Sequence, residues 1–197
     1  MHVTDDLRDN NFKIPSLSPL YVSQIVLQTN RDLTIKLHNV YIKGFETTTI
    51  QSINIDLKKR YINGKFNVKF LIIEGQYDVD GRILILPIKG KGPATVSCEN
   101  LNINFSFDYT LVKHKDGKDY MKPSPPTVEY TVEKIHFKLD NLFNGDKTLA
   151  DRTVEFLNEH SKEINEDFSS SIAETAAAII TNILNNMVQV PFDEIFD

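Results

Sequence analysis

The 197-residue sequence has a single cysteine, no tryptophan and no long apolar run. Cys98 alone cannot form an internal disulfide, and no metal site of the usual Cys/His spacing can be built around it. No apolar stretch approaches the ~18 residues that span a membrane, so we expect no stable membrane insertion. With a net charge of −5 and no basic cluster larger than residues 58–60, the chain lacks the footprint of a nucleic-acid-binding protein.

Motifs of the common enzyme classes are also missing. There is no Gly-x-Ser-x-Gly elbow, no His-Glu-x-x-His pair and no phosphate-binding loop. Cys98 has the parity of the apolar residues in its segment, which favours a buried thiol over a nucleophile. Gly90 and Gly92 precede no helix, so a strand entry or a bend explains them better than a phosphate loop does. We therefore predict no enzyme activity, no catalytic residues, no metal site and no cofactor.

The last third of the chain carries the strongest regular pattern. Residues 148–190 contain no Gly and no Pro, and apolar residues recur at helical spacing from Leu149 to Val190. One helix of this length would run roughly 65 Å, whereas a compact sphere of this chain length has a diameter of about 40 Å. We therefore predict one long helix at 146–190, with a capping-box-like start at Thr148, that either bends or is wrapped by an elongated sheet.

Two features of this predicted helix bear on function. Residues 169–178 are mostly small (SSSIAETAAA), which predicts either close packing of a sheet or an apolar cavity. Acidic residues also repeat at i+4 spacing, which predicts a solvated outer face that is unsuited to anionic lipid. This acidic ridge consists of Asp151, Glu155, Glu159, Glu163 and Asp167.

Residues 20–143 predict an antiparallel sheet. Apolar and polar residues alternate around Leu37, Ile55 and Phe70, as expected for strands with one buried and one wet face. The dipeptide at residues 63–64, Asn-Gly, is a strong hairpin signal. Residues 113–126 predict an exposed hairpin loop.

The apolar parity changes inside two of the predicted strands. It passes from even at Cys98 to odd at Leu101, and from even at Val132 to odd at Ile135. An extra residue in one strand produces such a change, so we predict β-bulges near residues 99–100 and 133–134. Bulges bend a sheet, as wrapping around a long helix requires.

These patterns describe one domain over residues 1–197. It divides into an irregular lead-in at 1–19, a curved antiparallel sheet at 20–143, the helix at 146–190 and a tail at 191–197. The predicted fold class is α+β, with a long C-terminal helix wrapped by a strongly curved antiparallel sheet. Because a rod inside a curved sheet favours a lengthwise apolar space, we expect the function to lie between the two.

Three blocks of sequence carry a family resemblance. They read IPSLSPLYVSQI at 14–25, GQYDVDGRILILPIKGKG at 75–92 and LDNLFNGDKTLADRTVEFLNEHSKEINEDF at 139–168. In this order they resemble the Takeout/juvenile-hormone-binding-protein family of insects, over roughly residues 14–197. The resemblance implies the tubular lipid-binding (TULIP-like) architecture, and it implies a secreted, non-enzymatic carrier that holds a hydrophobic small molecule in an internal tunnel.

The N-terminus departs from the family pattern. Members usually begin with a signal peptide, a segment with two disulfide-linked cysteines and a first helix. Residues 1–13 of this chain are polar and contain no cysteine, so we expect that segment to be absent or shortened. The expectation of an extracellular protein therefore rests on the resemblance, since residues 1–10 do not read as a signal peptide. A cytosolic protein is the alternative that these residues leave open.

The leading hypothesis is a lipid carrier. It would bind a juvenile-hormone-like terpenoid, a fatty acid, a quinone or a similar lipid through burial of apolar surface. We expect a monomer whose partner is this ligand, while the sequence names no protein receptor. Two of the predicted residues, Tyr109 and Tyr130, could fix a polar end of the ligand or reach solvent with their hydroxyls. The predicted ligand-binding residues are Ile35, Leu37, Ile53, Ile55, Phe66, Val68, Phe70, Ile72, Phe105, Phe107, Tyr109, Tyr130, Phe168, Ile172, Ala176 and Ile179.

The alternative hypothesis is an interaction protein with a filled core. It would engage a partner through the acidic ridge or through the loop at 113–126. The two hypotheses differ in one physical respect, which is whether the space between helix and sheet is empty.

Overall fold

A computed structural model describes residues 17–29 and 33–195, apart from the side chains of Asn186 and Met187. Residues 1–16 of the predicted lead-in and residues 196–197 of the predicted tail lie outside the described part. Eight strands come first: β1 (Leu20–Gln28), β2 (Thr34–Lys43), β3 (Thr48–Asp56), β4 (Tyr61–Ile83), β5 (Leu86–Lys113), β6 (Asp119–Pro123), β7 (Thr127–Thr131) and β8 (Lys134–Leu139). The helices are α2 (Lys147–Glu159), α3 (Ser161–Met187) and α4 (Phe192–Ile195), with the 3₁₀ turns η1 (Phe45–Thr47) and η2 (Phe143–Gly145).

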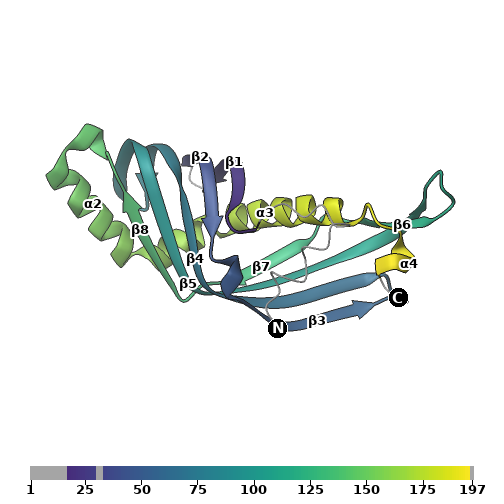
Figure 1. Cartoon of the computed structure of the whole chain (residues 1–197). Helices are drawn as coiled ribbons and strands as arrows, with labels where there is room; N and C mark the ends of the chain where they lie inside the picture. The colour runs from purple at the N-terminus through teal and green to yellow at the C-terminus, as the bar shows by residue number, and fades with distance from the viewer. Residues whose placement is uncertain (1–16, 30–32, 196–197) are drawn as a thin grey trace.

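The strands form one antiparallel sheet built around the long hairpin of β4 and β5. Its main order is β1-β2-β4-β5-β6, with β3 paired to β4 and both β7 and β8 paired to β5. Figure 1 shows β4 and β5 running the length of the molecule, with β1, β2 and β8 beside one half and β3, β6 and β7 beside the other. The sheet curves between the halves, and α3 lies along it. The predicted fold class is thereby confirmed.

The sheet bends where the inward-facing residues change from even-numbered to odd-numbered positions. This change occurs at the same level on β4, on β5 and between β7 and β8. On β5, Cys98 and Leu101 both face the interior, and between them Asn100 adopts a positive φ of 50°. The β5 register is nevertheless the same on both sides of this level, because Val68 opposes Leu101 and Phe70 opposes Glu99. The predicted bulges are therefore wrong in one respect. The parity change is real, but no strand gains a residue relative to its neighbour.

The partner strands follow the same course. β7 ends at Thr131 and β8 begins at Lys134, and their pairing with β5 also keeps one register across the gap. Register shifts occur elsewhere, on β2 between His38 and Tyr41 and on β3 between Ile50 and Ser52.

The predicted hairpin at residues 63–64 is also wrong. Asn63 and Gly64 lie inside β4, and the turn into β4 is at residues 57–60. Gly64 is needed because aromatic rings cover it: a Cβ there would lie 2.8 Å from the Phe66 ring and 3.0 Å from the Phe105 ring. These two rings stack at 5.4 Å. Glycine at this place provides a close approach rather than a turn.

The helix predicted at 146–190 is divided in two. At His160 the backbone leaves the helical region (φ −106°, ψ 20°), and α3 begins at the next residue. The His160 ring turns back to its own helix, where Nδ1 lies 3.0 Å from the Phe156 carbonyl oxygen and the ring stacks on Phe156 at 4.2 Å. The helix begins one residue before Thr148, capped by Asp146, whose carboxylate accepts from the Leu149 N–H at 3.1 Å. The long rod therefore bends, and α2 packs against β8 beyond the bend (Figure 1).

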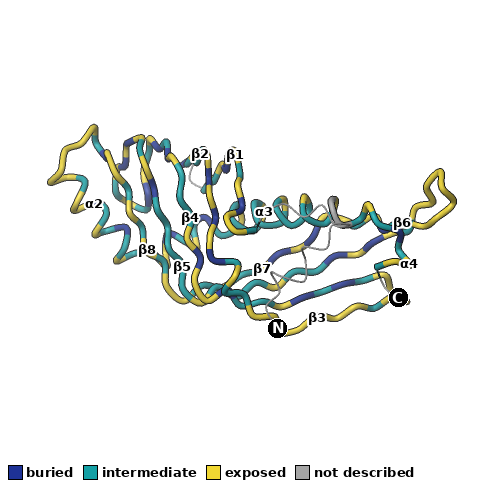
Figure 2. The backbone as a smooth tube through the Cα atoms, in the orientation of Figure 1, coloured by how far each residue is buried: buried dark blue, intermediate teal, exposed yellow. Residues whose placement is uncertain are grey.

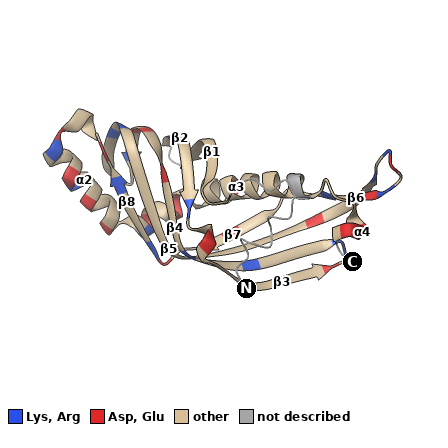
Figure 3. Ribbon diagram, viewed as in Figure 1, with Lys and Arg blue, Asp and Glu red and all other residues tan. Residues whose placement is uncertain are grey.

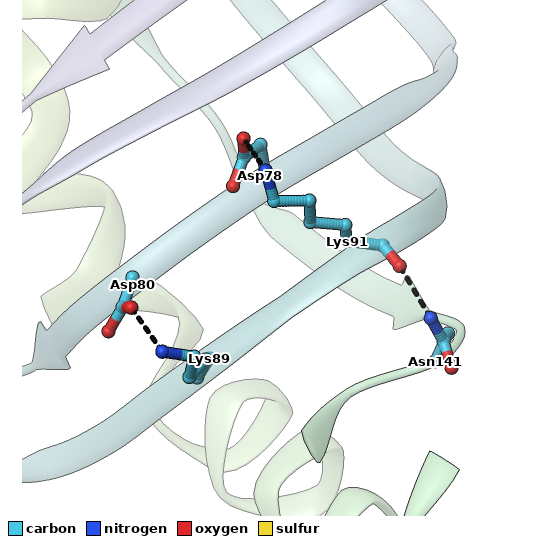
Figure 4. Close-up of polar contacts among 5 residues, drawn as sticks. All are labelled: Asp78, Asp80, Lys89, Lys91 and Asn141. Carbon is cyan, nitrogen blue, oxygen red and sulfur yellow. Dashed lines mark hydrogen bonds and ion pairs between the residues drawn. The ribbon is translucent and has the colours of Figure 1, made fainter. Parts of the chain in front are cut away.

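Two smaller predictions need adjustment. The loop predicted at 113–126 contains β6, so its exposed turn is confined to residues 114–118. Gly90 and Gly92 lie within β5 rather than at a strand entry. They are glycines because residues 140–142, which precede η2, pass close over them. A Cβ on Gly92 would lie 2.5 Å from the Asp140 carbonyl oxygen. The crossing is held by the Asn141 side chain, which donates to the Lys91 carbonyl at 2.8 Å (Figure 4).

Ion pairs mark the outer face of the same hairpin. Lys89 pairs with Asp80 at 2.6 Å and Lys91 pairs with Asp78 at 2.7 Å, as Figure 4 shows. Tyr77 and Val79, which alternate with these aspartates on β4, are buried. Figure 2 shows the same alternation of buried and exposed residues along the strands. The first four members of the acidic ridge are exposed and Asp167 is half-buried. Figure 3 shows acidic residues along α2.

Asn100, whose positive φ lies at the bend of the sheet, provides a first prediction. A valine at position 100 would have to adopt a positive φ, which costs a β-branched residue about 1–3 kcal/mol. We expect Asn100→Val to lower the free energy of unfolding by this amount in urea titrations. Asn100→Gly is the control, because it keeps the backbone conformation while it removes the side-chain hydrogen bond to Glu133. Equal losses in the two variants would show that the hydrogen bond, not the backbone, holds the kink.

Candidate ligand cavity

A cavity of about 850 Å³ lies between the concave face of the sheet and α3. This volume is within the range of small-molecule sites. The sheet supplies inward-facing aliphatic residues on both sides of the kink, such as Ile73 and Ile103, and the helix supplies one apolar stripe. The small residues of α3 leave the space open, since Thr175 and Ala176 form part of the wall.

Half of the predicted ligand-binding residues line this cavity. They come from β2, β4, β7 and α3, and the structure brings them to one interior: Ile35, Leu37, Phe66, Tyr130, Phe168, Ile172, Ala176 and Ile179. Their contact with a ligand stays a prediction.

Four of the predicted residues do not face the cavity. Phe70 and Ile72 are 48% and 38% exposed on the outer face, because β4 changes parity after Val68. Ile53 and Ile55 are 51% and 43% exposed for a different reason. They oppose Gly64 and Ile62 and so share the inner face, but β3 is an edge strand and no described element covers them. Their predicted place in the interior is wrong.

The other four are packed in the core without lining the cavity. Val68 lies in a cluster with Val40 and Leu71. Phe105, Phe107 and Tyr109 belong to a second cluster near α4, where the Tyr109 ring lies 5.7 Å from that of Phe192.

Several lining residues were not predicted from the sequence. The parity change of β4 brings Leu71 and Ile73 to the wall, whereas the sequence pattern predicted such changes only near residues 99–100 and 133–134. Asn165 also lines the cavity. It could have been found as a polar residue beside Ile164 and Phe168 on the apolar face of the helix.

Polar groups in the wall are few and uncharged. None of the described lining residues is Asp, Glu, Lys, Arg or His. Burial raises the pKa of Tyr77 to about 12, with a smaller contribution from the charge of Asp140. Burial also raises the pKa of the Cys98 thiol to about 11. The pKa of Tyr130 is raised to about 12, mainly by burial and to a smaller extent by the nearby Cys98. These three groups are therefore neutral at physiological pH.

The described part of the chain holds no group of three or more His, Cys, Asp or Glu residues that could bind a metal ion. None of its helices is long and apolar enough to cross a membrane. The chemistry that this wall offers is apolar contact and a few hydrogen bonds.

Comparisons with known proteins agree with this description. The model of the family described as haemolymph juvenile hormone binding protein matches residues 9–197. The crystal structure of Takeout 1 from Epiphyas postvittana superposes with a TM-score of 0.82 at 31% sequence identity, covering 90% of this chain and 82% of that one.

Two curated relatives match over shorter segments. The circadian clock-controlled protein daywake of Drosophila melanogaster is 32% identical over 128 residues, which is 64% of this chain and 49% of daywake. A putative beta-carotene-binding protein of Schistocerca gregaria is 24% identical over 107 residues, covering 54% of this chain and 43% of that protein. The chain thus spans about half the length of the curated relatives it matches.

Tyr77 and Tyr109 are both buried, but their hydroxyls differ in hydrogen bonding. They therefore form a matched pair for a stability test. The Tyr77 hydroxyl donates to the Asp140 carbonyl at 2.8 Å, whereas the buried Tyr109 hydroxyl has no partner in the described part of the chain. We expect Tyr77→Phe to lower the free energy of unfolding by about 1 kcal/mol. Tyr109→Phe should leave it unchanged or raise it, because the change removes an unsatisfied buried group. Urea titration of both variants decides, and an equal loss in Tyr109→Phe would reveal a partner for its hydroxyl.

Proposed function

The chain belongs to the haemolymph juvenile hormone binding protein family, and we propose that it binds and carries a hydrophobic small molecule in the cavity between its sheet and α3. The observation that carries this proposal is the uncharged, largely aliphatic wall around about 850 Å³. Family membership supports it, because the family is named for a hormone-binding protein. Transfer of apolar surface out of water supplies the driving force.

The energetics are adequate for a carrier. Burial contributes about 25 cal/mol per Å² of apolar surface, so a ligand that loses roughly 400 Å² gains about 10 kcal/mol. Lost translational and rotational freedom offsets a large part of that gain. The remainder suits a ligand that must be bound and later released.

The proposed ligand is a juvenile-hormone-like terpenoid, a fatty acid, a quinone or a similar lipid. The Schistocerca relative, named as a putative beta-carotene-binding protein, supports an elongated isoprenoid within this range. We propose that the chain acts as a monomer in an extracellular fluid, as the word haemolymph in the family description suggests. The eight predicted residues that line the cavity are the proposed contacts.

The cavity counts against the alternative of an interaction protein with a filled core. Residues of the acidic ridge are solvated, as expected for an outer helix face, and no observation connects them or the turn at 114–118 with a partner. Binding of a lipid is therefore the function that we put to the test.

Filling the cavity from α3 provides that test. Ala176 lines the wall, whereas Ala178, two residues further along the same helix, is exposed. We expect Ala176→Phe to weaken binding of the lipophilic fluorophore N-phenyl-1-naphthylamine by at least about tenfold, which corresponds to ~1.4 kcal/mol. Ala178→Phe, the matched control, should bind like the unmodified protein. Thermal unfolding of both variants verifies that they remain folded.

Two results would contradict the proposal. One is an unmodified protein that takes up no fluorophore and from which solvent extraction and native mass spectrometry recover no lipid. The other is an Ala176→Phe variant that loses stability by overpacking while the unmodified protein shows no binding to lose.

A further inference from the structure

One polar pair interrupts the aliphatic wall of the cavity. Tyr130 on β7 and Asn165 on α3 both line it, and the Tyr130 hydroxyl donates to Asn165 Oδ1 at 2.8 Å. β7 and α3 pack against each other (Figure 1). The hydrogen bond between Tyr130 and Asn165 therefore joins the sheet to the helix.

Two other hydroxyls of the wall, close to the same interior, already donate to backbone carbonyls. Tyr77 donates to the Asp140 carbonyl, and Thr175 donates to the Ser171 carbonyl within its own helix at 2.8 Å. Neither leaves a proton for a ligand, since a hydroxyl has one donor only.

The Tyr130–Asn165 pair has unused donors. A side-chain amide carries two N–H donors besides its oxygen, and the Asn165 nitrogen has no partner among the residues that the structure describes. A donor without a partner beside an apolar cavity gains from any acceptor that a ligand brings to it. The Tyr130 hydroxyl holds the amide oxygen and thereby fixes which atom of Asn165 is left to donate.

The cavity also discriminates by charge. No described lining residue carries a charge, so an ionised head group inside would be buried without a counter-ion, at a high cost in free energy. An uncharged oxygen can accept from an amide N–H without this penalty.

We propose that Tyr130 and Asn165 form a contact point for one uncharged oxygen of the ligand, which accepts a hydrogen bond from Asn165 Nδ2. The ligand is then an uncharged oxygenated lipid, such as an ester, ketone, ether or alcohol, in preference to a bare hydrocarbon or an ionised carboxylate of the same length. This inference rests on the proposed function, because it assigns a ligand class to the same cavity. The raised pKa values of Tyr130 and Cys98 keep the contact point neutral throughout the pH range of the test below.

A matched ligand series tests the contact point. Methyl dodecanoate, dodecanoic acid and dodecane share one chain, and each is titrated against bound N-phenyl-1-naphthylamine. In the unmodified protein we expect the ester to bind about five- to tenfold more tightly than dodecane, the ratio that one net hydrogen bond provides. The acid should bind more weakly than the ester at neutral pH and approach it when the pH falls below the carboxyl pKa of about 4–5.

Two variants separate this role from a structural one. Asn165→Leu removes the donor with little change in volume, and Tyr130→Phe removes the hydroxyl that orients it. In both variants the ester should lose its advantage over dodecane, while dodecane binds as before. Tyr109→Phe, at a buried tyrosine that does not line the cavity, should keep the full advantage of the ester.

The outcomes are distinct from those of the carrier test. Unchanged ester-to-dodecane ratios in both variants, or an equal loss of all three ligands, overturn the contact point and leave the carrier intact. A carboxylate that binds as tightly as the ester at neutral pH also overturns it. If neither the fluorophore nor any of the three ligands binds the unmodified protein, the proposed function itself fails.

Discussion

The structure depends on a kink that its longest strands make at one common level. The parity of β4 and β5 changes there while the register between them stays constant, and the line of β7 and β8 does the same. A change confined to one strand would have moved its side chains out of step with the neighbours. Because the change is shared, the sheet turns a corner without losing its ladder of hydrogen bonds, and apolar side chains face inward on both sides of the corner.

The helical part of the chain is also interrupted, so that it follows the bend in the sheet. His160 ends the helical ladder, and α2 and α3 then follow different directions along the curved sheet. A straight rod would have met only one half of the sheet. The small side chains around Ala176 keep α3 from filling the space that the curvature creates, so the molecule retains an interior of about 850 Å³.

The character of this interior connects the fold with carriage of a lipid. Its wall is aliphatic and carries no charge among the described residues, so it can hold apolar chains of many shapes with little discrimination. Discrimination then falls to the few groups that form hydrogen bonds, and Tyr130 with Asn165 is the pair whose donors are not all engaged. For the proposed ligand, affinity comes from the buried apolar area, and selectivity comes from one polar contact and the absence of charge.

Local pattern accounts for much of this protein. Helical spacing located the face of α3 that bears Phe168, Ile172 and Ala176, and alternation located the sheet and its change of parity at Cys98 and Leu101. The same rules failed where neighbours decide. Asn63-Gly64 has the form of a turn, yet Gly64 lies in a strand under two aromatic rings, and Ile53 is on the inner face of an edge strand that nothing described covers. By itself the sequence determined the elements and their apolar faces, because periodicity is a property of one segment. Only the tertiary structure decided that the space between them stays open and that Tyr130 meets Asn165 35 positions away, because both depend on how separate segments are placed against each other.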